Sequence, residues 1–108
     1  MTPASEGIYA ATLDNVAARM VEITHDSRSR DGWVRGRVRG DQHGPVEFHA
    51  KVYDEPSGYG IDEGRVSKLW VDGLFNYDRG DDFDQLPDGW LRVILWRLEH
   101  LPAARSVV

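Results

Sequence analysis

The chain has 108 residues, 41% of them hydrophobic, which is enough to bury one core, and we expect a single domain over residues 1–108. Its formal net charge of -5 argues against a general nucleic-acid-binding protein, whose surface is normally basic. The absence of cysteine excludes disulfides, thiolate catalysis and cysteine-ligated zinc. No stretch approaches the roughly 20 apolar residues of a membrane span, so we expect a cytoplasmic protein without a membrane segment.

Residues 12–23 are predicted to form a short amphipathic helix near the N-terminus. Its apolar positions recur at helical spacing: Leu13, Val16, Ala17 and Met20. The alternative is that Ile8, Tyr9, Val21 and Ile23 belong to strands that flank the helix.

Residues 33–39 and 46–53 alternate between apolar and polar side chains, which predicts two strands paired as a hairpin. One face of the first strand is mostly basic, with Trp33, Arg35, Arg37 and Arg39. His49 lies on the polar face of the second strand and is the best single candidate for a general base, although most such histidines only face solvent.

A second hairpin is predicted around Asp72-Gly73, a pair typical of a two-residue type I′ turn. That turn places Val71 opposite Leu74 and Trp70 opposite Phe75. Both faces of the hairpin would then be apolar near its tip, so we expect something to cover each face.

The last predicted element is a helix that begins at the N-cap Asp88 and ends near Leu101, before Pro102. Its apolar stripe contains Trp90, Leu91, Ile94, Leu95, Leu98 and Leu101. Val93 and Trp96 fall outside that stripe. The expected fold is α+β: a four-stranded antiparallel sheet of two hairpins, packed by this C-terminal helix, with the short N-terminal helix.

The acidic segment "VYDEPSGYGIDEGR", residues 52–65, carries two Asp-Glu pairs: Asp54, Glu55, Asp62 and Glu63. Such carboxylates can bind calcium or magnesium, but their spacing does not match a calcium-binding EF-hand loop. The glycines favour a shaped connection with solvated carboxylates, and we expect neither a metal nor another cofactor. Tyr59 and Ile61 are expected to fold back onto the core.

Charge is distributed unevenly along the chain. Residues 28–39 hold five Arg against one Asp, whereas residues 54–88 hold ten Asp or Glu against three Arg or Lys. The Arg side chains could pair with carboxylates of the same molecule, or bind phosphate or an acidic partner. The acidic loops could also imitate nucleic acid towards a basic protein.

Residues 50–70, "AKVYDEPSGYGIDEGRVSKLW", and 76–80, "NYDRG", resemble a family of small uncharacterised domains found in bacteria and their phages. In that family the second motif is followed by Trp-Asp, whereas Asp81 stands at the Trp position here. The resemblance implies a compact accessory protein of mobile-element origin, for which binding a host component is a commoner role than catalysis.

Two functional hypotheses follow. The first is a non-enzymatic protein that binds a protein partner, with inhibition of a host defence nuclease as a specific form and a homodimer left open. Its expected binding residues are Trp33, Arg35, Arg37, Arg39, Asp54, Glu55, Tyr59, Asp62, Glu63, Asp78, Arg79 and Trp96. The expected aromatic anchors are Trp33, Trp96 and one face of the cluster formed by Trp70, Phe75 and Tyr77. The alternative is a small hydrolase or nuclease that depends on magnesium or manganese, with ligands from Asp54, Glu55, Asp62 and Asp78.

Overall fold

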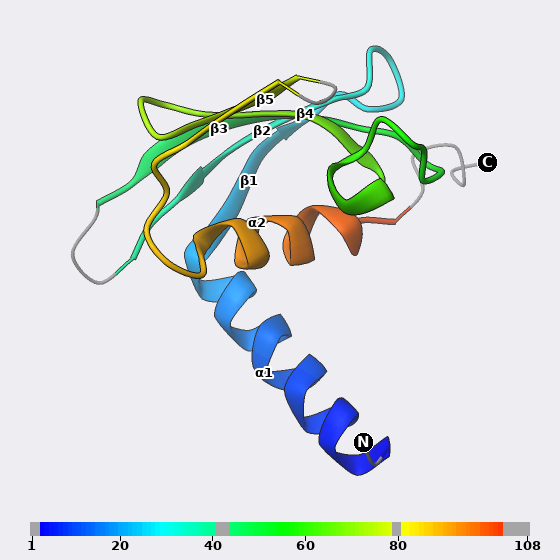
Figure 1. The fold of residues 1–108 in the computed structure, drawn as a ribbon, viewed down its shortest axis with the longest axis vertical. Coiled ribbons are helices and arrows are strands. Elements are labelled where there is room, and N and C mark those ends of the chain that lie inside the picture. The colour runs from blue at the N-terminus through cyan, green and yellow to red at the C-terminus, as the bar shows by residue number, and fades with distance from the viewer. Residues whose placement is uncertain (1–2, 41–43, 79–80, 103–108) are drawn as a thin grey trace.

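The computed structural model describes residues 3–40, 44–78 and 81–102, except for the side chains of residues 3–11 and 81–83. One residue of the expected binding set, Arg79, lies outside this part of the chain. The described residues form helices and one sheet (Figure 1). None of their helices has the length and apolar character needed to cross a membrane.

Within the described residues, six strands form one antiparallel sheet, in which each strand pairs with the next along the chain. They are β1 (Val21–Asp26), β2 (Trp33–Val38), β3 (Val46–Val52), β4 (Val66–Val71), β5 (Phe75–Asp78) and β6 (Asp81–Asp84). The expected α+β class is confirmed, but the expected count of four strands is wrong. The two unexpected strands are β1 and β6. β1 begins with residues that were assigned to the predicted N-terminal helix, and β6 is rich in Asp, a residue depleted in strands.

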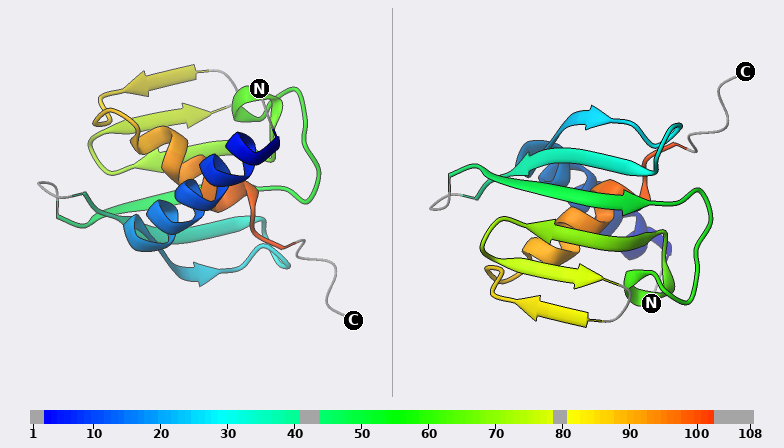
Figure 2. Two further views of the ribbon diagram at one scale, coloured as in Figure 1. Left: turned by 90° about the horizontal axis from the view of Figure 1, so that it is seen from below. Right: turned by 90° about the horizontal axis from the view of Figure 1, so that it is seen from above.

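Both helices, α1 (Pro3–Met20) and α2 (Trp90–Glu99), lie on the same face of the sheet (Figure 2). α2 lies against the sheet, and α1 packs across α2 (Figure 1). The N-terminal half of α1 extends away from the sheet (Figure 1). α1 is therefore longer than the predicted helix and ends at Met20, directly before β1. The opposite face of the sheet carries no described helix (Figure 2).

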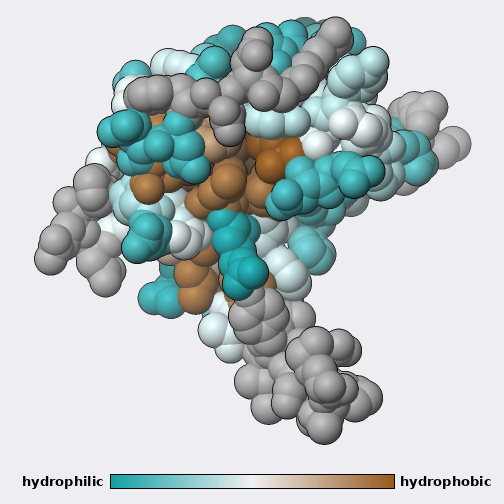
Figure 3. All heavy atoms as spheres, viewed as in Figure 1, coloured by the Kyte–Doolittle hydropathy of each residue, from teal (hydrophilic) through white to brown (hydrophobic). Residues whose placement is uncertain are grey.

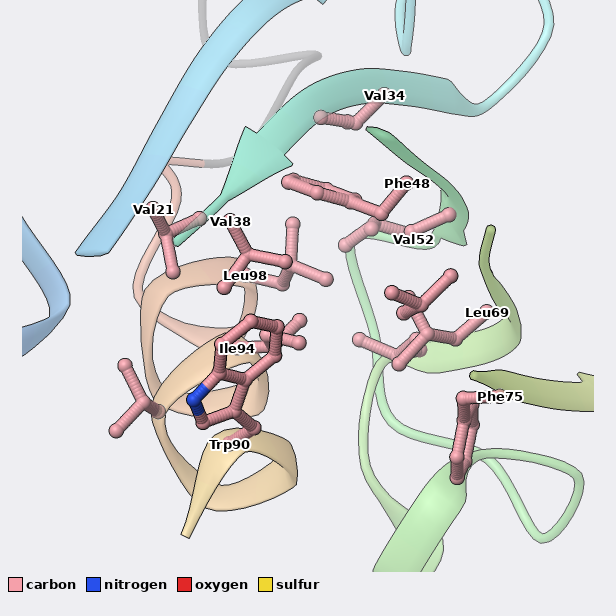
Figure 4. Close-up of a cluster of buried hydrophobic side chains, with 14 of the residues drawn as sticks. Val21, Val34, Val38, Phe48, Val52, Leu69, Phe75, Trp90, Ile94 and Leu98 are labelled. Carbon is pink, nitrogen blue, oxygen red and sulfur yellow. The ribbon is translucent and has the colours of Figure 1, made fainter. Parts of the chain in front are cut away.

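The hydrophobic core fills the space between the sheet and α2 (Figure 4). The largest fully buried side chains are Phe48, Leu69, Ile94, Leu98, Val34, Val38, Val52, Val66 and Val71. Leu13 and Ala17 of α1 are also buried. In the space-filling view, apolar side chains gather around α2 below the sheet, while hydrophilic ones line the sheet above them (Figure 3).

The predicted register of the second hairpin is wrong by one residue. β4 and β5 pair Val71 with Phe75 and Leu69 with Tyr77, so three residues, 72–74, form the loop. The Leu74 N–H donates to the Val71 carbonyl at 2.9 Å, and Gly73 has a φ of 73°. A type I′ turn would require a positive φ at Asp72 as well, but Asp72 is not among the described residues with positive φ.

The shifted register separates the two faces of this hairpin. Leu69, Val71 and Phe75 are buried under the helices. Trp70 lies on the opposite face, where it pairs with Asn76 and remains 37% exposed. The expectation of two covered apolar faces is therefore wrong, because one face is mostly polar.

The C-terminal helix differs from its prediction at both ends. α2 begins at Trp90, after Gly89 with a φ of 83°, and no side chain caps its N-terminus, so Asp88 is not the N-cap. It ends at Glu99, before the expected Leu101, which is nevertheless buried. Val93 was expected outside the stripe but is buried, because α1 packs beside α2 and widens its covered face.

Candidate functional site

The acidic connection between β3 and β4 is mainly a structural loop. It contains the short 3-10 helix η1 (Ile61–Glu63), in which Asp62 and Glu63 have φ values of 53° and 58°. Ile61 is buried, as expected, but Tyr59 is 65% exposed, so the expectation that it folds onto the core is wrong. The side chains of Glu55, Asp62 and Glu63 are exposed and Asp54 is half-buried.

Arg65 ties this loop to the end of α2. Its backbone N–H donates to both carboxylate oxygens of Glu99, at 2.8 and 3.1 Å. Its guanidinium donates to the backbone carbonyls of Tyr53, Glu99 and Leu101, each at 2.8 Å. A Cβ on Gly64 would collide with the Glu99 carboxylate, so glycine permits the close approach. Arg65 therefore satisfies carbonyls that the end of the helix leaves open.

The carboxylates named for a metal-dependent hydrolase are not brought together. Among the described residues, no group of three or more His, Asp or Glu side chains is placed to hold a metal ion. Asp78 lies on β5 opposite Lys68, whose Nζ is 3.8 Å from its carboxylate. Asp62 belongs instead to η1 in the loop between β3 and β4, and its side chain is exposed.

A different surface gathers aromatic and basic side chains. The face of the sheet opposite the helices, here called the open face, presents Trp33, Arg35, Arg37, His49, Lys51, Lys68 and Trp70, and also the carboxylates of Glu22, Glu47 and Asp78. The register places Trp33, Lys51 and Lys68 in one row across β2, β3 and β4. A second row contains Arg35, His49 and Trp70. Cross-strand neighbours on one face lie about 5 Å apart, so these side chains form one continuous surface.

The rings on the open face contact their polar neighbours. The His49 and Trp70 ring centroids are 4.9 Å apart, with the planes tilted by 55°. The Lys51 Nζ lies 5.9 Å from the Trp33 ring centroid and 5.8 Å from that of Tyr53, which is 40% exposed. Such cation–π contacts hold the ammonium near the rings and keep its charge on the surface.

The Arg side chains of β2 are paired only in part with carboxylates of the same molecule. Arg37 lies 4.0 Å from Glu22, and both side chains are more than half exposed, so this pair is weak. Within the described chain, neither Arg35 nor Arg39 makes a side-chain ion pair or hydrogen bond, and both are exposed. The internal-pairing hypothesis thus holds for Arg37 alone.

A stronger ion pair lies beside this surface, where the chain leaves β1. Arg28 donates to both carboxylate oxygens of Asp26 at 2.9 Å and to the Pro102 carbonyl at 2.6 Å. The hydrogen bond from the Arg28 side chain holds the pKa of Asp26 below its usual value, although partial burial opposes the shift. Arg28 therefore anchors the end of β1 to the segment after α2.

Trp96 does not belong to the open face. Its indole Nε1 donates to Asp14 of α1 at 2.6 Å, and its ring stacks on His100 at a centroid distance of 4.2 Å. It is half-buried and connects the two helices. Because both helices lie on the face opposite the open face, Trp33 and Trp96 lie on opposite sides of the sheet. The two tryptophans expected as anchors, Trp33 and Trp96, therefore do not share one surface.

The open face also presents three side chains that were not among the expected binding residues: His49, Lys51 and Lys68. The alternation of β3 already placed His49 and Lys51 beside the Arg strand, and this signal could have identified them. Trp70 was expected as an anchor together with Phe75 and Tyr77, but the observed register leaves Trp70 as the one residue of these three on the open face.

The comparisons with known proteins agree with the suggested resemblance at its broad level. A search of curated proteins and a search of solved structures both found no match. The family model described as "Domain of unknown function (DUF7678)" matches residues 32–96, from the turn before β2 to most of α2. This match covers more than half of the chain and includes the strands that form most of the open face. The chain belongs to this family of domains of unknown function.

Proposed function

We propose that this chain is a non-enzymatic binding domain whose protein partner docks on the open face of the sheet. The observation that carries the proposal is the combination of exposed rings and unpaired cations on that face. Trp70 and Tyr53 are 37% and 40% exposed, and Arg35 lies between them and the edge strand β1 without an internal partner among the described residues. Trp, Tyr and Arg are the residues that most often dominate the binding energy of protein interfaces.

The size of the face is adequate for a modest interface. Six strands about 4.8 Å apart, with about six residues each at about 3.3 Å, present roughly 500 Å² of flat area. Side-chain relief increases the accessible area, which approaches the roughly 800 Å² that each partner contributes to a standard interface. The open face can therefore support a specific complex without the helix side.

Two cations of the open face that lack an ion pair among the described residues indicate the chemistry of the partner. Lys51 and Arg35 carry positive charge that the described carboxylates do not neutralise, so an acidic protein segment is complementary. The net charge of -5 disfavours a nucleic acid, because every phosphate that approaches meets the negative field of the whole chain.

Site-specific photo-crosslinking tests this proposal. A photoreactive residue replaces Trp70 on the open face in one variant and Asn15, which is exposed on α1, in a matched control. We expect a crosslinked protein at position 70 and none at position 15. The partner, once purified, should bind the Trp70→Ala variant at least about tenfold more weakly, as expected for an aromatic anchor. Crosslinking at position 15 alone, or unchanged affinity of Trp70→Ala, would refute the proposal.

Inhibition of a host defence nuclease is a narrower form of the proposal, and it predicts a different contact. Imitation of nucleic acid would use the acidic rim of η1, where Asp62 and Glu63 are exposed. A third crosslinking variant at position 63 separates the two forms. A nuclease captured at position 63 but not at position 70 would favour the inhibitor and reject docking on the open face.

A further inference from the structure

A hollow of about 480 Å³ opens on the open face above β1, β2 and β3. Its lining residues are His25, Ser27, Asp31, Trp33, Arg35 and His49. Arg35 lies at the centre of this group, because it is the cross-strand partner of His25 on one side and of His49 on the other. Three nitrogen-bearing side chains from neighbouring strands therefore line one concavity.

Arg35 supplies most of the hydrogen-bond donors in this hollow. A guanidinium has five N–H donors, and within the described residues none of those of Arg35 is used in an ion pair or a hydrogen bond. A neutral imidazole has one N–H donor and a protonated one has two, and Nδ1 of His25 already lies 3.4 Å from the Thr24 hydroxyl. The planar fork of Arg matches the two oxygens of a carboxylate.

Other polar side chains of the hollow are already engaged. The Ser27 hydroxyl donates to Asp31 at 2.8 Å and lies 3.1 Å from the Trp33 carbonyl. The same Asp31 oxygen accepts the Trp33 N–H at 3.0 Å, and the Ser27 bond is the largest cause that lowers the pKa of Asp31. Asp31 is thus a fixed negative charge on the rim, which opposes an anion and limits its affinity.

The β1 bulge explains why the hollow exists. The register of β1 against β2 shifts between Ile23 and His25, so the strand carries one extra residue, Thr24. The Thr24 hydroxyl lies 3.2 Å from the Arg35 carbonyl and fixes the bulge against β2. Beyond it, His25 again stands opposite Arg35 and forms one wall.

We propose that this hollow is an oxyanion site that receives a side-chain carboxylate from an acidic segment of the protein partner. This inference rests on the proposed function and identifies the contact that gives it charge specificity. A carboxylate suits the site because the Arg35 guanidinium can bind both of its oxygens. Trp33 lines the same hollow and shields one side of this Arg35–carboxylate ion pair from water. Shielding matters, because a fully exposed pair contributes little.

The test uses a hexaglutamate peptide as the probe and the full chain labelled for NMR. Titration should shift the Arg35 side-chain Nε–H and the His25 and His49 ring signals together, with a single dissociation constant. The shifts should weaken as salt rises from about 50 to 300 mM, because salt screens exposed charges. A hexathymidine oligonucleotide serves as the competing class of ligand.

Three variants separate the site from general charge effects. Arg35→Gln should weaken hexaglutamate binding by roughly fivefold or more, because it removes the bidentate donor. Arg19→Gln, with the same charge change on exposed α1, should change it by less than about twofold. Asp31→Asn keeps the acceptor oxygen for Ser27 and Trp33 but removes the opposing charge, so it should tighten binding about twofold. A misfolded protein could not produce that gain.

The outcomes distinguish this inference from the proposed function. Equal losses in Arg35→Gln and Arg19→Gln, or tighter binding of hexathymidine than of hexaglutamate, would overturn the oxyanion site. If the purified partner loses affinity for Trp70→Ala but not for Arg35→Gln, the open face is the docking surface and the oxyanion site is rejected. If neither variant matters, both proposals fail.

Discussion

Arg65 should contribute more to stability than any exposed arginine, because its guanidinium bonds three backbone carbonyls from two segments of the chain. In the Arg65→Met variant the aliphatic stem remains, but the bonds to Tyr53, Glu99 and Leu101 are lost. The bond to Tyr53 lies at the surface, where water can replace it. The other two are partly buried, and each charge-assisted bond is worth about 1.5 kcal/mol. The expected loss is therefore about 3 kcal/mol in the free energy of unfolding.

Urea unfolding followed by circular dichroism measures this loss, and thermal unfolding should show a decrease in Tm of about 12 °C. The matched control is Arg30→Met, an exposed arginine for which we expect a change within about 0.5 kcal/mol. Arg65→Lys retains the charge but lacks the planar fork, so it should lose most of the same stability. If Arg65→Met unfolds within 0.5 kcal/mol of the unaltered chain, the role assigned to these three bonds is wrong.

Two further perturbations test the sheet. Gly36→Ala should lower the free energy of unfolding by about 2 kcal/mol, because the added Cβ would collide with the Glu22 carbonyl and lie 2.7 Å from the Phe48 ring. Gly44→Ala is the control: the space around Gly44 is open, so the free energy of unfolding should change little. Urea titrations of both variants check this, and equal stability would contradict it. Asp26→Asn should cost about 1 kcal/mol at pH 7. The folded pKa of Asp26 is lowered, so its contribution is present above the unfolded value of about 3.9 and is lost as the pH falls through the folded value. The difference between Asp26→Asn and the unaltered chain should therefore shrink as the pH falls below about 3.9 and vanish below the folded value, and a difference that stays constant with falling pH would show that the ion pair is not its source.

The elements that the sequence predicted well are those in which burial alternates cleanly. β2 buries Val34 and Val38, and β3 buries Phe48, Ala50 and Val52, so one face of each strand is consistently apolar. β1 lacks this pattern because it is an edge strand with a bulge, and only Val21 is fully covered. β6 lies at the other edge, and a strand with three Asp in four residues has little apolar signal to detect.

The hairpin register shows why local turn preference was a poor guide. A two-residue turn at Asp72-Gly73 would place Phe75 on the face with Trp70. The three-residue loop instead places Phe75 and Tyr77 with Leu69 and Val71, on the side covered by the helices. Burial of a Phe side chain is worth about 2 kcal/mol, more than turn types usually differ, so the core decides the register.

Long-range contacts account for much of what the sequence could not reveal about the site. The bond between Trp96 and Asp14 joins residues 82 positions apart, and it holds Trp96 between the two helices. The contact of Arg65 with Glu99 likewise depends on where α2 ends against the loop. Charge counting located the Arg strand, but only the fold shows that Arg35 and not Arg37 is left without a carboxylate among the described residues.

β2 separates stability from binding along a single strand. Gly36 faces the core, where Phe48 packs directly against it, while Arg35 and Arg37 flank it on the open face. A change at Gly36 should therefore lower the free energy of unfolding, whereas Arg35→Gln should leave it within about 0.5 kcal/mol and weaken only the binding of an acidic ligand. Because adjacent residues of a strand point to opposite faces, the two effects can be measured one residue apart. The tight packing at Gly36 holds the backbone that positions Arg35, so the rigidity of the core also fixes the geometry of the oxyanion site.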